Sequence, residues 1–232
     1  MLDVIGTIVL AAVIALNISA VSSALPARSA TRLAVAAAAG MWTALAAEVA
    51  AAGYFADTAA PFPVIGVFVV FPLVAVGIAA LLSPAARAAL LAIPMQTLVG
   101  LNIARVLGAF FLLLALADRL GGPFPQSAGW GDVITGLLAI PVMGLATQVS
   151  AAANRKIALW NAFGTLDLIA AVTFGVISAN GSPLQLIHAG AGSAAVQLLP
   201  WSLIPTVLVP FYLITHGIVF AQLRARRIGA AL

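Results

Sequence analysis

Ionisable side chains in this sequence occur inside long apolar stretches. Arg105 lies in QTLVGLNIARVLGAFFLL and Asp167 lies in WNAFGTLDLIAAVTFGVISA. A charge at the centre of a bilayer costs about 2.5–3.5 kcal/mol on insertion scales, so such residues usually face protein and find a partner. A guanidinium and a carboxylate that meet there can fix helix register, or they can line a path for a solute or a proton. Both interpretations stay open.

Helix geometry favours a pair between these two residues. With a rise of about 1.5 Å per residue, Arg105 lies roughly 16 Å and Asp167 roughly 15 Å along their predicted helices from the same side, near the middle of a hydrocarbon core about 30 Å thick. Glu48 lies higher, at about 22 Å, and is the rival partner, whereas His216 lies lower, at about 10 Å. We therefore predict a midplane Arg105–Asp167 ion pair, with Glu48 as a titratable group on the outer side and His216 as a relay on the cytoplasmic side.

Both helices present small residues beside the charge. Positions 164, 167, 171, 175 and 178 share one helix face and read Gly, Asp, Ala, Gly and Ser. Positions 102, 105, 108 and 109 read Asn, Arg, Gly and Ala. Small residues next to polar ones are typical of close helix–helix contacts in membranes, so we expect both charges to point toward protein.

Other polar residues complete the set of candidate binding or relay residues. Amide side chains in the apolar stretches are expected to form hydrogen bonds between helices. A lone intramembrane histidine is hydrogen-bonded structure, a proton relay or a haem ligand, and with His188 on the opposite side a bis-histidine haem site is disfavoured. The candidates beyond the central pair are Glu48, Gln96, Asn102, Asp132, Asn161, Tyr212 and His216.

The elements that must position these residues are membrane-spanning helices. The chain has 232 residues, of which 64% are hydrophobic and 7% charged, whereas soluble domains carry about 25% charged residues. A spanning helix needs roughly 20 mostly apolar residues. The stretches that qualify are about Leu2–Ala24, Leu33–Ala52, Pro63–Leu82, Pro94–Ala117, Val133–Ala152, Ile157–Ala179 and Leu199–Leu223. We expect an all-α fold in which residues 1–232 form a single seven-helix transmembrane domain.

The distribution of basic residues predicts the orientation. The side that holds the connections after the first, third and fifth stretches, together with the C-terminal tail, carries Arg28, Arg32, Arg87, Arg155, Lys156, Arg224, Arg226 and Arg227. The other side carries Arg119 alone. By the positive-inside rule the N-terminus is outside and the C-terminus is cytoplasmic. The abundance of alanine and the preference for Arg over Lys indicate a bacterial source, and hence the inner membrane.

Several classes of activity find no support in the sequence. There are no cysteines, which excludes disulfides, thiolate metal sites and cysteine nucleophiles, and no HExxH or GxSxG motif occurs. The cations are spread between apolar stretches, so nucleic acid is not expected as a partner. The sequence indicates no particular enzyme activity and leaves that question open. It predicts no resident metal and requires no cofactor, with haem as an alternative. The expected partners are the lipid bilayer, a small solute or proton, and a second copy or a larger membrane complex.

Three resemblances bear on this interpretation. Seven spans with an outside N-terminus resemble the microbial rhodopsins, but their retinal needs a lysine in the seventh span, and Lys156, the only lysine here, precedes the sixth. Seven-span sugar carriers share the topology, but their proline–glutamine signature lies within helices, and Pro125–Gln126 falls in a predicted connection. The strings QTLVGLNIARVLGAFFLL, AGWGD, WNAFGTLDL and LIPTVLVPFYLITHG resemble a set of bacterial seven-span inner-membrane proteins without an assigned activity. That resemblance covers residues 96 to 216 and implies a recognisable pattern of Gln96, Arg105, Trp130, Asp132, Asn161, Asp167 and His216.

One leading hypothesis and two alternatives follow. The leading hypothesis is a small permease-like or proton-handling protein of the bacterial inner membrane, built on the Arg105–Asp167 pair. The first alternative is a haem- or pigment-binding redox membrane protein that uses His216. The second is a non-catalytic structural or assembly subunit of a membrane complex.

Overall fold

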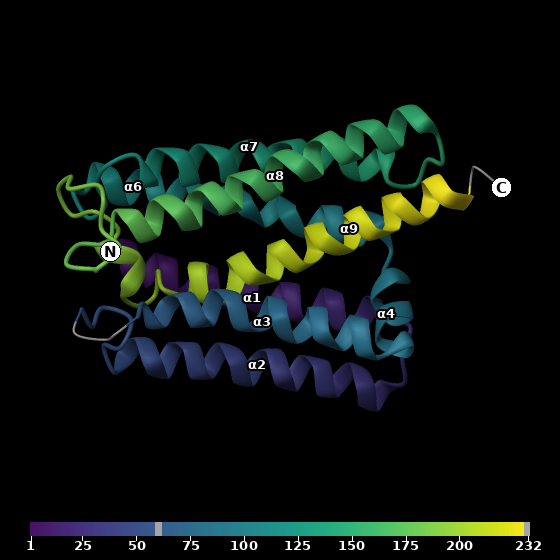
Figure 1. Ribbon diagram of the computed structural model, residues 1–232, viewed down its shortest axis with the longest axis horizontal. Helices are drawn as coiled ribbons and strands as arrows, with labels where there is room; N and C mark the ends of the chain where they lie inside the picture. Colours follow the sequence, from purple (N-terminus) through teal and green to yellow (C-terminus); the bar gives the residue numbers. More distant parts are fainter. Residues whose placement is uncertain (59–61, 230–232) are drawn as a thin grey trace.

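Seven helices of the described chain are long and apolar enough to cross a membrane, which confirms the all-helical, seven-span prediction (Figure 1). The structure is a computed structural model that describes residues 1–58 and 62–229, and these residues contain no strand. The spans are α1 (Leu2–Ala24), α2 (Ser29–Ala51), α3 (Val64–Leu82), the composite span Met95–Leu116, α7 (Phe124–Leu145), α8 (Ala151–Ile177) and the composite span Ile204–Arg226. Their lengths and composition indicate a multi-pass membrane protein.

The bundle has a well-packed centre and an exposed edge. In Figure 1, α7 and α8 run together along one side, α1, α2 and α3 run along the other, and α9 lies between them. In their most apolar windows, the two composite spans are 44% and 56% buried, against 11% in both α2 and α3. Side chains on the composite spans therefore face mostly protein, whereas most of α2 and α3 faces outward, as expected of helices in contact with lipid.

The first composite span changes its helix type in the middle of the bundle. It consists of α5 (Met95–Leu101), the 3₁₀ segment η1 (Asn102–Gly108) and α6 (Ala109–Leu116). Asn102 Nδ2 donates to the Leu98 carbonyl at 2.9 Å, and such local bonds compete with the helix ladder. A 3₁₀ helix has about three residues per turn, so Asn102, Arg105 and Gly108 align on one face, and all three are buried. The η1 segment packs mainly against α7.

The last span begins with a π turn. The turn η3 (Ile204–Leu208) contains Pro205 and leads into α9 (Val209–Gly229). Proline cannot donate to the helix ladder, so in a membrane neighbouring groups must satisfy the freed carbonyls. Pro210, the second residue of α9, frees the carbonyl of Thr206 four residues before it, and Trp42 of α2 donates its Nε1–H to that carbonyl at 3.0 Å. The predicted break before His216 is thus a π turn that α2 holds in place.

The predicted start of the fifth span is wrong. Helix α7 begins at Phe124 rather than at Val133, with a proline in its first turn, a position that proline favours. The polar and glycine residues of FPQSAGWGD conceal this start in the sequence, because they lower the mean hydropathy of α7. Its most apolar window reaches only 1.4, the lowest value among the spans. Asp132 consequently lies about two turns inside a helix, and not at the end of a connection.

The two ends of the bundle differ in charge. We call the end that holds residue 1, together with the connections 117–123 and 178–200, the N-terminal end (Figure 1). Arg119 lies there and pairs with Asp3, with Nη1 and Oδ1 2.6 Å apart. The basic residues predicted to share the other side lie at the opposite end, on the α1–α2 connection, α4 (Pro84–Leu91), the start of α8 and the end of α9. The side chain of Arg227 lies outside the described part.

Candidate functional site

Arg105 is the centre of a buried polar cluster formed by η1, α7, α8 and α9. Its side chain is 1% exposed. Nε donates to Asp132 Oδ1 on α7, and Nη2 donates to Asp167 Oδ2 on α8, both at 2.6 Å. Nη1 donates to the Gly164 carbonyl at 3.1 Å and to His216 Nε2 on α9 at 2.9 Å. The planar guanidinium carries several donors in a fixed fork, so one side chain ties three helices to η1. We call Arg105, Asp132, Asp167 and His216 the arginine cluster.

The predicted Arg105–Asp167 pair is present, and a second carboxylate joins it. The sequence suggested Glu48 as the rival partner of Arg105, but the second carboxylate that pairs with Arg105 is that of Asp132. The reason is the early start of α7, which lowers Asp132 from the predicted connection to the level of Arg105. Hydrogen bonds between charged groups are shorter and stronger than neutral ones, and the two 2.6 Å contacts are of this kind.

His216 is held in one tautomer by its neighbours. Because arginine can only donate, His216 Nε2 is the acceptor, and its ring proton is on Nδ1, which donates to Asn161 Oδ1 at 2.7 Å. Asn161 Nδ2 in turn donates to the His216 carbonyl at 3.0 Å. The ring is therefore neutral in this arrangement. Haem ligation through His216 would require one of these two ring bonds to break, and His188 is exposed in the 178–200 connection.

Tyr212 of α9 and Asn102 of η1 lie beside the cluster and extend its polar contacts. The Arg105 Cζ atom lies 5.9 Å from the centroid of the Tyr212 ring, which is within range of a cation–π interaction. The Tyr212 hydroxyl accepts a hydrogen bond from Asn17 Nδ2 of α1 at 3.2 Å. Asn102 Nδ2 lies 3.5 Å from Thr215 Oγ1. Polar contacts therefore connect the cluster to α1 as well.

Two glycines let the helices approach closely enough for short aspartates to reach Arg105. A Cβ atom on Gly131 of α7 would overlap the carboxylate of Asp167 on α8. A Cβ atom on Gly164 of α8 would lie 2.8 Å from His216 Nε2 on α9. Small residues serve the same purpose at other contacts between membrane helices. A side chain at either position would displace a member of the arginine cluster.

The cluster contains more negative than positive charge. With His216 neutral, one guanidinium (+1) and two ionised carboxylates (−2) sum to −1. An unbalanced charge inside a bilayer is costly. The cluster is therefore suited to take up one positive charge, either a proton or the cationic group of a ligand.

Glu48 and Gln96 lie outside the cluster, which corrects the prediction that they face the bundle interior. Both side chains are exposed. Glu48 is in the last turn of α2, and the buried residues of that helix, Ala46 and Ala50, lie on another face. Gln96 is in the first turn of α5, directly after Pro94. At helix ends long polar side chains reach the membrane surface, so neither residue needs a buried partner.

The predicted depth of His216 is also wrong. The residue is in direct contact with Arg105 rather than well below it. Helix α9 continues to Gly229 instead of ending near Leu223. With about 1.5 Å per residue, this extension raises His216 to the level of the arginine.

Sequence reasoning missed two residues beside the cluster. Asn17 is 2% exposed and reaches Tyr212. Trp160 is buried, its ring centroid lies 5.4 Å from that of His216, and its Nε1–H donates to the Thr135 carbonyl at 3.0 Å. Asn17 carries the same signal as Asn102, a single amide within an apolar stretch, and could have been found by it.

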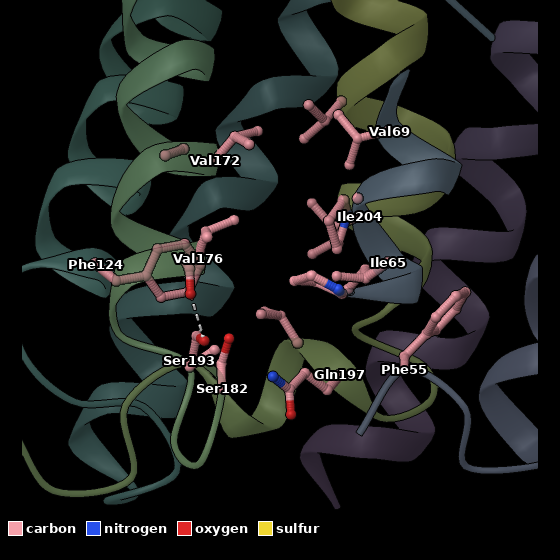
Figure 2. Close-up of a pocket in the computed structure, with 18 of the residues that line it drawn as sticks. Phe55, Ile65, Val69, Phe124, Val172, Val176, Ser182, Ser193, Gln197 and Ile204 are labelled. Atoms are coloured by element: carbon pink, nitrogen blue, oxygen red, sulfur yellow. Dashed lines mark hydrogen bonds between the residues drawn. The ribbon is translucent and has the colours of Figure 1, made fainter. Parts of the chain in front are cut away.

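An open cavity leads from the N-terminal end of the bundle to the cluster, and its space amounts to about 1020 Å³ with the open solvent at the mouth included. Figure 2 shows Ser182, Ser193 and Gln197 gathered near its mouth, and Val172 farther inside. The dashed line in Figure 2 is the bond from Ser193 Oγ to the Gly175 carbonyl, 2.7 Å long, which fastens the 178–200 connection to α8. The lining follows α8 down to Leu168 and includes Asp132, whose side chain is 12% exposed.

Residues 61–224 match the family described as a domain of unknown function, DUF8737. The match covers well over half of the chain and contains the arginine cluster, α3 and the later helices as far as Arg224 in α9, whereas α1 and α2 precede it. No functionally curated protein and no solved structure matches the chain. The protein is a helical bundle with a charged centre beneath an open cavity. Because the family model matches more than half of the chain, the protein belongs to the DUF8737 family.

Proposed function

We propose that this protein is a small permease-like membrane protein, in which a solute enters the cavity and the arginine cluster handles a proton or a charged group. One observation carries the proposal: the cavity reaches Asp132, so a buried charge centre is accessible from one end of the bundle. An ion pair that only fixes helix register needs no such access. Pockets with mostly apolar walls and a few convergent polar groups are the usual form of a binding site for a small molecule.

We further infer the side from which the solute enters. The basic residues lie at the end opposite the mouth, so by the positive-inside rule the mouth faces the outside of a bacterial inner membrane. A solute would therefore reach Asp132 from the external side. Release to the other side requires a second conformation, and the π turn η3 beside the cavity is a suitable hinge, since π turns are frequent at functional sites.

Unsatisfied polar atoms near the cluster support a polar occupant. Asn17 Oδ1, Asn102 Oδ1 and Thr135 Oγ1 are buried and have no hydrogen-bond partner in the described part of the chain. Each such atom costs about 1–3 kcal/mol, and native proteins usually give buried polar groups a partner. Asn17 bonds to Tyr212, Asn102 lies one 3₁₀ turn before Arg105, and Thr135 packs near Gly164 and His216, which is consistent with a route for protons or for the polar part of a solute.

Thiol labelling tests whether the cavity is open to water. The chain has no cysteine, so the Ala171→Cys variant carries a single thiol on the wall of the cavity, one helical turn from Asp167. We expect a membrane-impermeant maleimide to label this variant in intact cells, because the mouth faces outside. The matched control is Leu166→Cys on the same helix, where the wild-type side chain is 65% exposed on the outer surface of the bundle. That thiol would lie among acyl chains and is expected to stay unlabelled. An inert Ala171→Cys variant, tested from both sides of the membrane, would overturn the proposal.

Proton flux tests the role of the cluster. In proteoliposomes that contain a pH-sensitive dye, a potassium diffusion potential should drive protons through the wild-type protein. We expect Asp132→Asn to abolish most of this flux, because the amide keeps the shape but cannot carry the proton. Glu48→Gln, which changes an exposed carboxylate away from the cavity, should keep the wild-type rate. Equal rates in all three proteins would contradict proton handling by the cluster.

A further inference from the structure

We propose that the cavity binds an organic cation with an apolar body, whose positive charge pairs with Asp132 in competition with a proton. The inference rests on the proposed function and names the class of its solute. It follows from the negative charge of Asp132 at the inner end of the cavity, from the apolar and aromatic walls, and from the Oδ2 atom of Asp132, which is available to a ligand.

The charges that line the cavity are of one sign. Its described lining contains Asp132 and Asp57 but no lysine, arginine or histidine. Arg105 is the nearest positive group, and four of its hydrogen bonds already go to the cluster and the Gly164 carbonyl. An anionic solute would therefore meet a carboxylate before it met an unoccupied donor. Apolar walls strengthen this discrimination, because electrostatic interactions are less screened away from water.

One carboxylate oxygen of Asp132 is available to a ligand. Its Oδ1 accepts from Arg105 Nε, whereas its Oδ2 has no hydrogen-bond partner among the described residues. The side chain is 12% exposed and lines this cavity, and it also lines a smaller adjoining pocket that Arg105 shares. The two carboxylates exceed the single guanidinium by one negative charge. A monovalent cation at Oδ2 makes the whole site neutral.

The walls select an organic cation over a metal ion. Phe55, Phe111 and Phe124 line the cavity together with aliphatic side chains, and aromatic faces attract organic cations. Metal cations such as Ca²⁺ and Mg²⁺ need about six oxygen ligands or retained water, which the apolar surroundings of Asp132 do not supply. In a solute with one positive charge and a bulky apolar body, the charge would pair with Asp132 and the body would pack against the apolar walls.

A proton and the cation compete for the same carboxylate. The ionisable groups around Asp132 are Arg105 of η1, Asp167 of α8 and Tyr212 of α9. His216 of α9 contacts Arg105, Asp57 lines the same cavity from the α2–α3 connection, and α3 contributes no ionisable group. Of these, only Arg105 carries a positive charge in the observed arrangement. If Asp132 or Asp167 holds a proton, a cation that binds at Asp132 Oδ2 therefore displaces it. Cation binding should weaken as the pH falls, because a protonated carboxylate no longer attracts a positive charge.

Two probe ions of nearly equal shape and opposite charge test the inference. Isothermal titration calorimetry would measure tetraphenylphosphonium and tetraphenylborate binding to the purified full chain in a non-ionic detergent. We expect the phosphonium to bind with an affinity that decreases at lower pH, with proton release in the pH range where one of the two carboxylates is protonated, and the borate not to bind. Asp132→Asn should weaken phosphonium binding roughly 30-fold or more, since loss of one partner of a buried charge pair has an effect of this size. Glu48→Gln is the matched carboxylate control and should bind like the wild type.

A second variant keeps the test decisive if Asp132→Asn does not fold. Val172→Phe fills part of the cavity without changing any charge, and it should abolish phosphonium binding. Equal binding of both ions, lost in Val172→Phe, would overturn the cationic class while leaving the cavity as a solute site. If the Ala171→Cys variant is labelled but the protein binds neither ion, the cationic class is again overturned and the cavity remains a solute site. Failure of the labelling itself would overturn the proposed function and this inference together.

Discussion

Replacing Arg105 with alanine is expected to lower the free energy of unfolding by about 3–5 kcal/mol, the usual effect of removing one partner of a buried ion pair. The side chain is 1% exposed and compensates two carboxylates at once. Without it, Asp132 and Asp167 would face one another without a counter-charge, and His216 would lose its partner on Nε2. Thermal unfolding of the purified protein in detergent, followed by tryptophan fluorescence, measures the change.

Two substitutions show whether the position or merely the charge matters. Arg105→Lys keeps the charge but cannot reproduce the fork that bonds to both aspartates, so it should remain clearly less stable than the wild type. Arg119→Ala removes a guanidinium that also forms a 2.6 Å pair, with Asp3, but whose side chain is 33% exposed. Exposed pairs contribute about 0–1 kcal/mol, so this variant should unfold close to the wild type. Equal losses in Arg105→Ala and Arg119→Ala would show that the cluster is not the centre of stability.

Neutralising the carboxylates should partly restore the Arg105→Ala variant. The added changes Asp132→Asn and Asp167→Asn remove the uncompensated charges and keep the shapes of the side chains. The triple variant should therefore be more stable than Arg105→Ala alone, because neighbouring sites that share an interaction are not additive. A triple variant less stable than the single one would mean that packing, and not charge, explains the loss.

Gly131→Ala is expected to cause the second largest effect. A Cβ atom at this position would overlap the Asp167 carboxylate, and α7 and α8 would have to separate or the carboxylate would have to leave Arg105. Overpacking of this kind costs about 1–3 kcal/mol, to which the weakened ion pair is added. The expected result is a lowered unfolding temperature, together with loss of proton flux in proteoliposomes.

Gly217→Ala is the matched control for this substitution. Like Gly131, Gly217 is the direct neighbour in the chain of a residue of the arginine cluster. A Cβ atom on Gly217, however, would meet no atom within 4 Å. Alanine is favoured over glycine inside a helix by about 0.5–1 kcal/mol, so this variant should unfold at the same or a slightly higher temperature. If both alanine variants behaved alike, the close approach of α7 and α8 at Gly131 would not be what positions Asp167.

The spans, their order and the central pair could be predicted because each depends on local properties of the chain. Hydropathy is a sum over neighbouring residues, and a run of about 20 apolar residues has few alternatives to a spanning helix. The Arg105–Asp167 pair followed from helical rise, since two costly charges at one depth stabilise one another. The observed 2.6 Å contact between them confirms that step.

The composition of the cluster was decided by the tertiary structure. Asp132 joined because α7 begins inside a stretch of low hydropathy, and His216 joined because α9 extends beyond its apolar part. The 3₁₀ segment sets the rotation that presents Arg105 to three helices, and Gly131 and Gly164 set their separation. The cavity above Asp132 likewise depends on how far α3 lies from α8.

The sequence by itself therefore determined a seven-helix membrane protein with a buried arginine and aspartate at one depth. Only the tertiary structure decided which groups surround that arginine, how many carboxylates share it, and from which end of the bundle the cavity reaches them. The physical reason is that hydropathy and helical rise act along one segment. The rotation, length and spacing of neighbouring helices are set by contacts between residues far apart in the chain, and these contacts place the charges.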